Sequence, residues 1–126
     1  MSAPVELPLL RIDPVTAEPM ARWAQALNDA NPIHSDRAAA EALGFGQHTV
    51  NPGPTNLAYA INLLLAAVPD RDIATIEARF LGNVLSEQSV VATGTLAGNQ
   101  GELAVDRIGD GQPVLRVAAT LRDDPA

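Results

Sequence analysis

The chain has 126 residues and a mass of 13.2 kDa, which allows one domain, residues 1–126, and excludes an enzyme built from several modules. Hydrophobic residues make up 47% of the chain and charged residues 18%, so the sequence predicts a soluble globular protein and not a disordered one. The formal net charge of −7 repels nucleic acid phosphates and anionic lipid headgroups, so we expect neither nucleic acid nor membrane as a partner.

The first part of the chain predicts one strand and two helices. Residues Val5–Ile12 are apolar but include a proline, which donates no ladder hydrogen bond, so an edge strand is expected there. Asp13 or Thr16 then caps a helix that ends near Asn28 and whose apolar positions recur at helical spacing. A second, alanine-rich helix is predicted over Asp36–Leu43, closed by a glycine.

A third predicted helix, Thr55–Val68, is apolar on nearly every side and must therefore be wrapped by other structure. It follows the segment Pro52–Pro54 and ends before a proline. The apolar run is far shorter than the roughly 20 residues needed to cross a bilayer. Because residues Met1–Arg11 also lack the pattern of a secretory signal, a cytoplasmic location is expected.

The remainder of the chain predicts an antiparallel meander of strands separated by polar and glycine-containing turns: Ile73–Leu81, Ser89–Ala97, Glu102–Ile108 and Val114–Arg122. This order of elements indicates an α+β protein, a single hot-dog domain in which an antiparallel sheet wraps around the central helix. Aromatic residues are only 3% of the chain, so we expect a core of small aliphatic side chains around these residues: Trp23, Phe45, Tyr59 and Phe80.

The segment between the first two predicted helices carries the candidate chemistry. Pro32 disfavours a continuous helix here, so Asn28–Ser35 is expected to form a tight loop in which Asp29 and His34 can converge. A carboxylate and an imidazole together can hold one water or hydroxyl and move its proton. The structural alternative is that Asp29 only forms a turn and His34 only caps the next helix.

A specific pattern runs through this stretch: Trp23, Leu27, Asp29, Asn31, Pro32, Ile33, His34 and, after five further residues, Ala40. It resembles the hydratase 2 signature of the MaoC-like (R)-specific enoyl-CoA hydratases and dehydratases. The resemblance implies a hot-dog fold, with Asp29 and His34 as the catalytic pair and Asn31 shaping the active loop. Asn28 stands where that family usually has glycine.

The start of the central helix gives a second match, at Gly53, which aligns with the family's glycine whose amide binds the thioester carbonyl. A helix N-terminus offers unpaired N–H groups and the positive end of a dipole, suited to charge developing on an enolate oxygen. Pro52 and Pro54, which replace the usual His and Met, have no N–H, so Gly53 is the only donor of the three. The alternative is an ordinary helix cap. Nearby polar residues either line the site or cap the helix: Asn51, Thr55 and Asn56.

The resemblance implies a hydratase or dehydratase that interconverts a 2-enoyl thioester and a (R)-3-hydroxyacyl thioester, in fatty acid or polyketide metabolism. Asp29 and His34 would act on water, and the Gly53 amide would polarise the carbonyl. No redox cofactor or metal is expected. The carrier is coenzyme A or an acyl carrier protein; carrier proteins are typically acidic, so the net charge of −7 favours coenzyme A. A homodimer or a hot-dog heterodimer is expected.

Other functions use the same fold. The chain could be one subunit of a heteromeric hydratase, an isomerase or cyclase of a specialised pathway, or a noncatalytic acyl-binding protein. Hot-dog thioesterases and the other hot-dog dehydratase type generally carry an acidic residue on the central helix, and Thr55–Val68 has none. A metal site is not expected, because the chain has no cysteine and His34 and His48 are fourteen positions apart. His48 is expected to be a solvated or packing residue.

Overall fold

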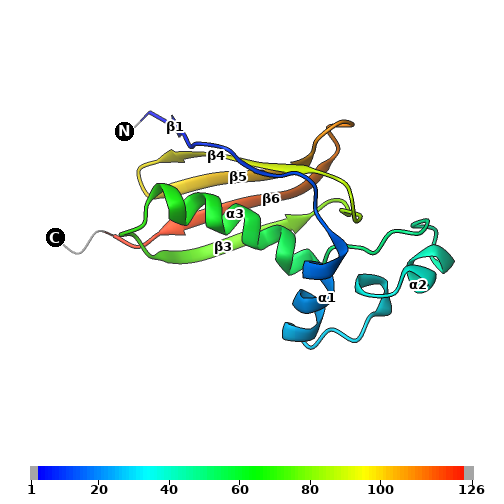
Figure 1. The fold of residues 1–126 in the computed structure, drawn as a ribbon. Coiled ribbons are helices and arrows are strands. Elements are labelled where there is room, and N and C mark those ends of the chain that lie inside the picture. Colours follow the sequence, from blue (N-terminus) through cyan, green and yellow to red (C-terminus); the bar gives the residue numbers. More distant parts are fainter. Residues whose placement is uncertain (1–2, 124–126) are drawn as a thin grey trace.

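The computed structural model describes residues 3–123 (Figure 1). Its elements in chain order are β1 (Val5–Glu6), β2 (Leu10–Ile12), α1 (Ala17–Ala26), the 3-10 turn η1 (Pro32–His34), α2 (Arg37–Ala42), α3 (Gly53–Ala67), β3 (Ile73–Phe80), β4 (Val90–Ala97), β5 (Gln100–Arg107) and β6 (Pro113–Leu121). The strands form one antiparallel sheet, and α3 lies across one face of it. The expected α+β architecture, a sheet around a central helix, is confirmed.

The order of strands in the sheet is β1-β4-β5-β6-β3, with β2 also paired to β4. Strands β4, β5 and β6 form the predicted meander, but β3 pairs with β6, with Ile76 opposite Ala119, and not with β4. The expectation of a four-strand meander is therefore wrong at its first strand. The reason is the connection of nine residues, 81–89, between β3 and β4. It exceeds the usual hairpin loop of roughly 2–5 residues and carries the chain across the sheet to β4, which lies beyond β6 and β5.

The boundaries of the helices follow from local sequence. Thr16 occupies the N-cap position of α1, as expected, but its side chain makes no capping hydrogen bond. The Asp36 side chain does cap α2, where it accepts a hydrogen bond from the Ala38 N–H. The central helix begins at Gly53, two residues before the expected Thr55. The N-terminal segment forms two short edge strands instead of one. None of the helices within residues 3–123 has the length and apolar character required to cross a bilayer.

The core lies between α3 and the sheet and is almost entirely aliphatic. Leu64 of α3 and Leu115 of β6 are fully buried, and burial of each such leucine contributes about 1.5–3 kcal/mol to folding. The expectation that the aromatic residues form the core is wrong for Trp23 and Phe80, which are 37% and 55% exposed. Aliphatic side chains, mainly of α3 and the sheet, fill the core cluster without either ring, so both rings remain at the surface.

Candidate active site

The loop that carries Asp29 begins with a defined end to α1. The Asn28 N–H donates to the Gln25 carbonyl at 3.1 Å, and the Asp29 N–H donates to the Ala24 carbonyl at 2.9 Å. Asn28 has a φ of 54°, so the helix ends in a Schellman motif with a left-handed residue. Asparagine adopts this conformation more readily than most residues that carry a Cβ. It can therefore occupy a position where the related signature has glycine, and it places Asp29 directly beyond the helix.

Two side chains then fold the loop back on itself. Asp29 Oδ1 accepts a hydrogen bond from the Asn31 N–H at 2.9 Å, and Asn31 Oδ1 accepts one from the Ile33 N–H at 3.2 Å. Both are Asx turns, and the second caps η1, whose first residue is Pro32. Asp29 therefore has the turn-forming role that was the alternative to a catalytic one. One carboxylate oxygen forms the turn, while the other is left for His34. Asn31 shapes the loop with its side-chain oxygen.

His34 is held between this loop and the chain that leads into α3. Its Nε2 lies 3.1 Å from Asp29 Oδ2, and its Nδ1 donates to the Val50 carbonyl at 2.7 Å. A carbonyl only accepts, so Nδ1 carries a proton in every state of the ring. Nε2 therefore presents a lone pair in the neutral ring and a proton in the imidazolium. The two groups can exchange one proton at Nε2, next to a carboxylate oxygen.

The exposure of the pair favours contact with a ligand. The His34 side chain is 10% exposed and the Asp29 side chain 36%. The imidazole is thus fixed by its surroundings, while the carboxylate is open to an approaching molecule. A buried, oriented base beside an accessible acid is an arrangement suited to proton transfer.

The same segment connects the loop to the start of α3. The Val50 N–H donates to the Ile33 carbonyl at 2.9 Å, and the Asn51 N–H donates to the Val84 carbonyl at 2.7 Å. Gly53 is the first residue of α3, and no acceptor for its N–H is found within residues 3–123. A Cβ on Gly53 would lie 3.3 Å from the Phe80 ring, so a side chain there is crowded. The structure thus leaves one free donor at the end of the helix that lies nearest α1 (Figure 1).

The polar residues predicted near this helix start contact one another. Asn51 Nδ2 donates to Asn56 Oδ1 at 2.7 Å and to the Tyr59 hydroxyl at 3.2 Å. Asn51 and Asn56 are 3% and 2% exposed. The Thr55 hydroxyl is also buried and, among the residues described, has no hydrogen-bond partner. Tyr59 was not among the residues predicted for this cluster. It lies three residues after Asn56 on the same helix, and this spacing places both side chains on one side of α3.

Tyr59 has a perturbed titration. Burial raises the pKa of its hydroxyl above the ordinary value, and the hydrogen bond from Asn51 opposes that shift. The hydroxyl is therefore protonated at neutral pH. It accepts a hydrogen bond from Asn51 and still has its own proton to donate.

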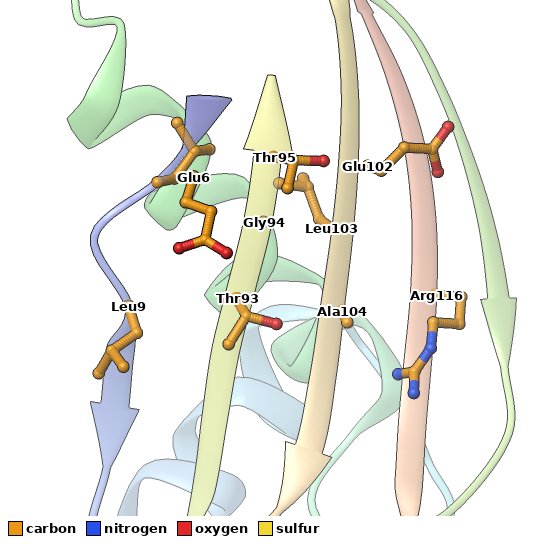
Figure 2. A pocket seen from close by; sticks show the side chains of 10 residues that line it. Glu6, Leu9, Thr93, Gly94, Thr95, Glu102, Leu103, Ala104 and Arg116 are labelled. Atoms are coloured by element: carbon orange, nitrogen blue, oxygen red, sulfur yellow. The ribbon is translucent and has the colours of Figure 1, made fainter. Parts of the chain in front are cut away.

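Other candidate groups lie apart from the pair. His48 Nδ1 lies 3.3 Å from the Ser86 hydroxyl, which agrees with the expected loop histidine. Within the part of the chain that the structure describes, no three His, Asp or Glu side chains are arranged to hold a metal ion. One hollow of about 420 Å³ lies on the outer face of the sheet, away from α3, between Glu6, Glu102 and Arg116 (Figure 2). It contains none of the predicted site residues, so Asp29 and His34 lie outside it.

Solved structures with the same architecture identify the fold. The chain is similar to the (R)-hydratase from A. caviae involved in PHA biosynthesis, with a TM-score of 0.81, 18% identity, and coverage of 96% of this chain and 94% of that one. It is also similar to a chain of the ChsH1-ChsH2 complex from Mycobacterium tuberculosis (TM-score 0.80, 16% identity, 93% and 94% covered). A chain of the HadBC (3R-hydroxyacyl-ACP dehydratase) complex from the same organism gives a TM-score of 0.77 at 18% identity, with 96% of both chains covered. The protein therefore has the hot-dog fold of these hydratases.

The family follows from the sequence itself. The profile of the MaoC like domain matches residues 4–110. The chain belongs to the MaoC-like dehydratase family. No curated protein sequence matches it.

Proposed function

We propose that this protein catalyses the reversible addition of water to a 2-enoyl thioester, giving a (R)-3-hydroxyacyl thioester. The observation that carries the proposal is the 3.1 Å approach of His34 Nε2 to Asp29 Oδ2, with the imidazole fixed by the Val50 carbonyl. Membership of the MaoC-like family supports it. The stereochemistry is proposed by analogy with the (R)-hydratase and the 3R-hydroxyacyl dehydratase to which the chain is similar.

The acid, the base and the oxyanion donor of the proposed reaction all come from this chain. Asp29 and His34 hold one water, and the pair removes a proton as the water oxygen forms its bond to the β-carbon. The electrons of the double bond move toward the thioester carbonyl, where the Gly53 N–H stabilises the enolate oxygen. A proton then passes from the pair to the α-carbon. Dehydration is the reverse reaction, and neither direction needs an oxidant or a reductant.

Asn51, Thr55 and Asn56 are proposed to border the substrate at the helix start. Their support is position, since all three are buried within three residues of Gly53. The Thr55 hydroxyl, without a partner among the described residues, is the group most in need of one from a ligand. The net charge of −7 favours coenzyme A over an acidic carrier protein as the group that carries the thioester.

A second hot-dog chain is proposed to complete the site. Strand β3 ends the sheet, paired only on its β6 side within residues 3–123. Phe80, the last residue of that strand, lies beside Gly53 and is 55% exposed, and Leu81, which follows it, is 45% exposed. An unpaired edge with apolar side chains is a surface that proteins cover, commonly with a second copy. Two of the similar structures are themselves complexes, ChsH1-ChsH2 and HadBC, so the second chain is either a copy or a related subunit.

The test is hydration of crotonyl-CoA and longer enoyl-CoAs, followed as loss of the enone absorbance. The proposal predicts turnover by the purified chain or by the chain mixed with a hot-dog protein encoded nearby. Turnover only in the mixture selects the heteromeric form. Absence of turnover in both cases, with every chain length, contradicts the proposal.

A further inference from the structure

The peptide between Val50 and Asn51 connects the loop of His34 to the chain around it. The Val50 carbonyl accepts the hydrogen bond from His34 Nδ1 at 2.7 Å, and the next N–H along the chain, that of Asn51, donates to the Val84 carbonyl at 2.7 Å. The C=O and the N–H of a trans peptide lie in one plane and point in opposite directions. The direction of the carbonyl that holds His34 therefore depends on what holds Asn51.

The side chain of Asn51 ties this peptide to the central helix. Its Nδ2 carries two hydrogens and donates to two different acceptors, Asn56 Oδ1 at 2.7 Å and the Tyr59 hydroxyl at 3.2 Å. Both acceptors lie in the first two turns of α3. Because Asn51 is only 3% exposed, water does not readily replace these bonds when they are lost. The backbone N–H and both amide hydrogens of Asn51 are thus bound within the protein.

Asn51 also lies two positions before the proposed oxyanion donor. Pro52 stands between Asn51 and Gly53; it is buried, and its ring fixes φ, here at −58°. The proline leaves few rotatable bonds to absorb a shift of Asn51, so such a shift is passed on to the Gly53 N–H. Asn51 therefore connects two groups that the proposed reaction needs at a set separation, the imidazole of His34 and the N–H at the start of α3.

We infer that Asn51 is a positioning residue, which fixes the imidazole of His34 relative to the Gly53 N–H by joining the peptide between them to α3. This inference rests on the proposed function, in which both groups act on one substrate. Asn51 itself transfers no proton. A displacement of about 1 Å in such a site costs about 10²-fold in rate. Because the loss falls on the transition state, it lowers kcat and leaves KM nearly unchanged.

The kinetic test measures crotonyl-CoA hydration by Asn51→Ala, in whichever assembly of the wild type is active. We expect kcat to fall at least tenfold while KM stays within about threefold of the wild-type value. Asn99→Ala is the matched control, because Asn99 also makes two side-chain hydrogen bonds, with Arg71 and Asp123, in the turn between β4 and β5. It should change neither constant by more than about twofold. A raised KM with an unchanged kcat in Asn51→Ala, or no change in either, overturns the inference.

Variants of the two acceptors test the same bonds from the side of the helix. Tyr59→Phe and Asn56→Ala each remove one acceptor of the Asn51 amide, and we expect each to lower kcat by about threefold or more. Added to Asn51→Ala, Tyr59→Phe should cause no further loss, because the bond is already absent. Losses that multiply in the double variant overturn the inference. If Asn51→Ala does not fold, a wild-type kcat in both Tyr59→Phe and Asn56→Ala overturns it.

An NMR measurement separates this inference from the proposed reaction. The Val50 carbonyl holds the proton on His34 Nδ1, so the NMR signal of that ring N–H should exchange slowly with water. We expect exchange at least tenfold faster in folded Asn51→Ala than in the wild type and Asn99→Ala. If this difference is found but no thioester turns over, the proposed reaction fails while the positioning of His34 by Asn51 stands. Equal exchange rates in the three proteins overturn the inference, whatever their rates of hydration.

Discussion

His34 Nε2 lies 3.1 Å from Asp29 Oδ2, and the two residues come from opposite ends of one short loop. On a continuous α-helix residues five apart point away from one another by about 140°. The Schellman motif at the end of α1 and two Asx turns replace that helix with a reversal. The geometry of the candidate acid and base is thus set by hydrogen bonds within the loop, together with the bond from His34 Nδ1 to the Val50 carbonyl.

The left-handed residue before the pair gives a stability prediction. Asn28 has a φ of 54°, and a residue with an ordinary Cβ in this region costs about 1–2 kcal/mol. We expect Asn28→Ala to lower the free energy of unfolding by about 1 kcal/mol and Asn28→Gly to preserve or raise it. Urea unfolding measures both. An alanine variant as stable as the glycine variant would show that the turn is not held in this conformation.

The close approach of Gly53 and Phe80 predicts that a substitution at Phe80 offsets the effect of a substitution at Gly53 on the hydration rate. A Cβ on Gly53 would lie 3.3 Å from Phe80 Cε1, closer than most Cβ contacts. We expect Gly53→Ala to lower hydration about tenfold, because a small displacement of the helix start moves the proposed oxyanion donor. Adding Phe80→Ala relieves the contact and should restore part of the rate. A double variant no faster than Gly53→Ala alone would argue against the contact as the cause.

The raised pKa of Tyr59 predicts a dependence of stability on alkaline pH. Since the folded state holds the phenol proton more tightly than the unfolded state, this stabilisation is complete below the ordinary pKa of 10.0 and is lost as pH rises through the folded value. We expect the melting temperature to fall more steeply above about pH 10 in the wild type than in Tyr59→Phe. Parallel curves for the two proteins would mean that Tyr59 is not desolvated.

The exposed end of β3 predicts an assembly. Light scattering at micromolar concentration should give a dimer of this chain, or a complex when the partner subunit is added. Leu81 is 45% exposed, and Leu81→Asp, which places a charge on the covered surface, should weaken association at least tenfold. Leu43→Asp, the same change at an exposed leucine that follows α2, serves as control. A wild-type chain that is monomeric and fully active alone would contradict the assembly.

The sequence predicted the elements and the candidate pair better than it predicted their arrangement. The residues from Asn28 to His34 specify their own turns, so a short-range pattern sufficed for Asp29 and His34. Pairing of β3 with β6 depends on contacts between residues far apart in the chain, which alternation along one strand does not encode. The contact between Asn51 and Tyr59 likewise depends on how the loop enters α3. Phe80 was misplaced because hydrophobic character alone does not distinguish a core residue from one on the exposed edge of a sheet.

The most direct test of the account is the rate of crotonyl-CoA hydration by Asp29→Asn, measured in whichever assembly of the wild type is active. Asparagine keeps the oxygen that accepts the Asn31 N–H, so the loop should persist while the carboxylate is lost. Asp36→Asn is the matched control, because Asp36 makes the same kind of bond, to the Ala38 N–H at 2.9 Å. The account predicts a fall of about 10²–10⁴ for Asp29→Asn and a change within about twofold for Asp36→Asn. A rate near that of the wild type in a folded Asp29→Asn protein would contradict it.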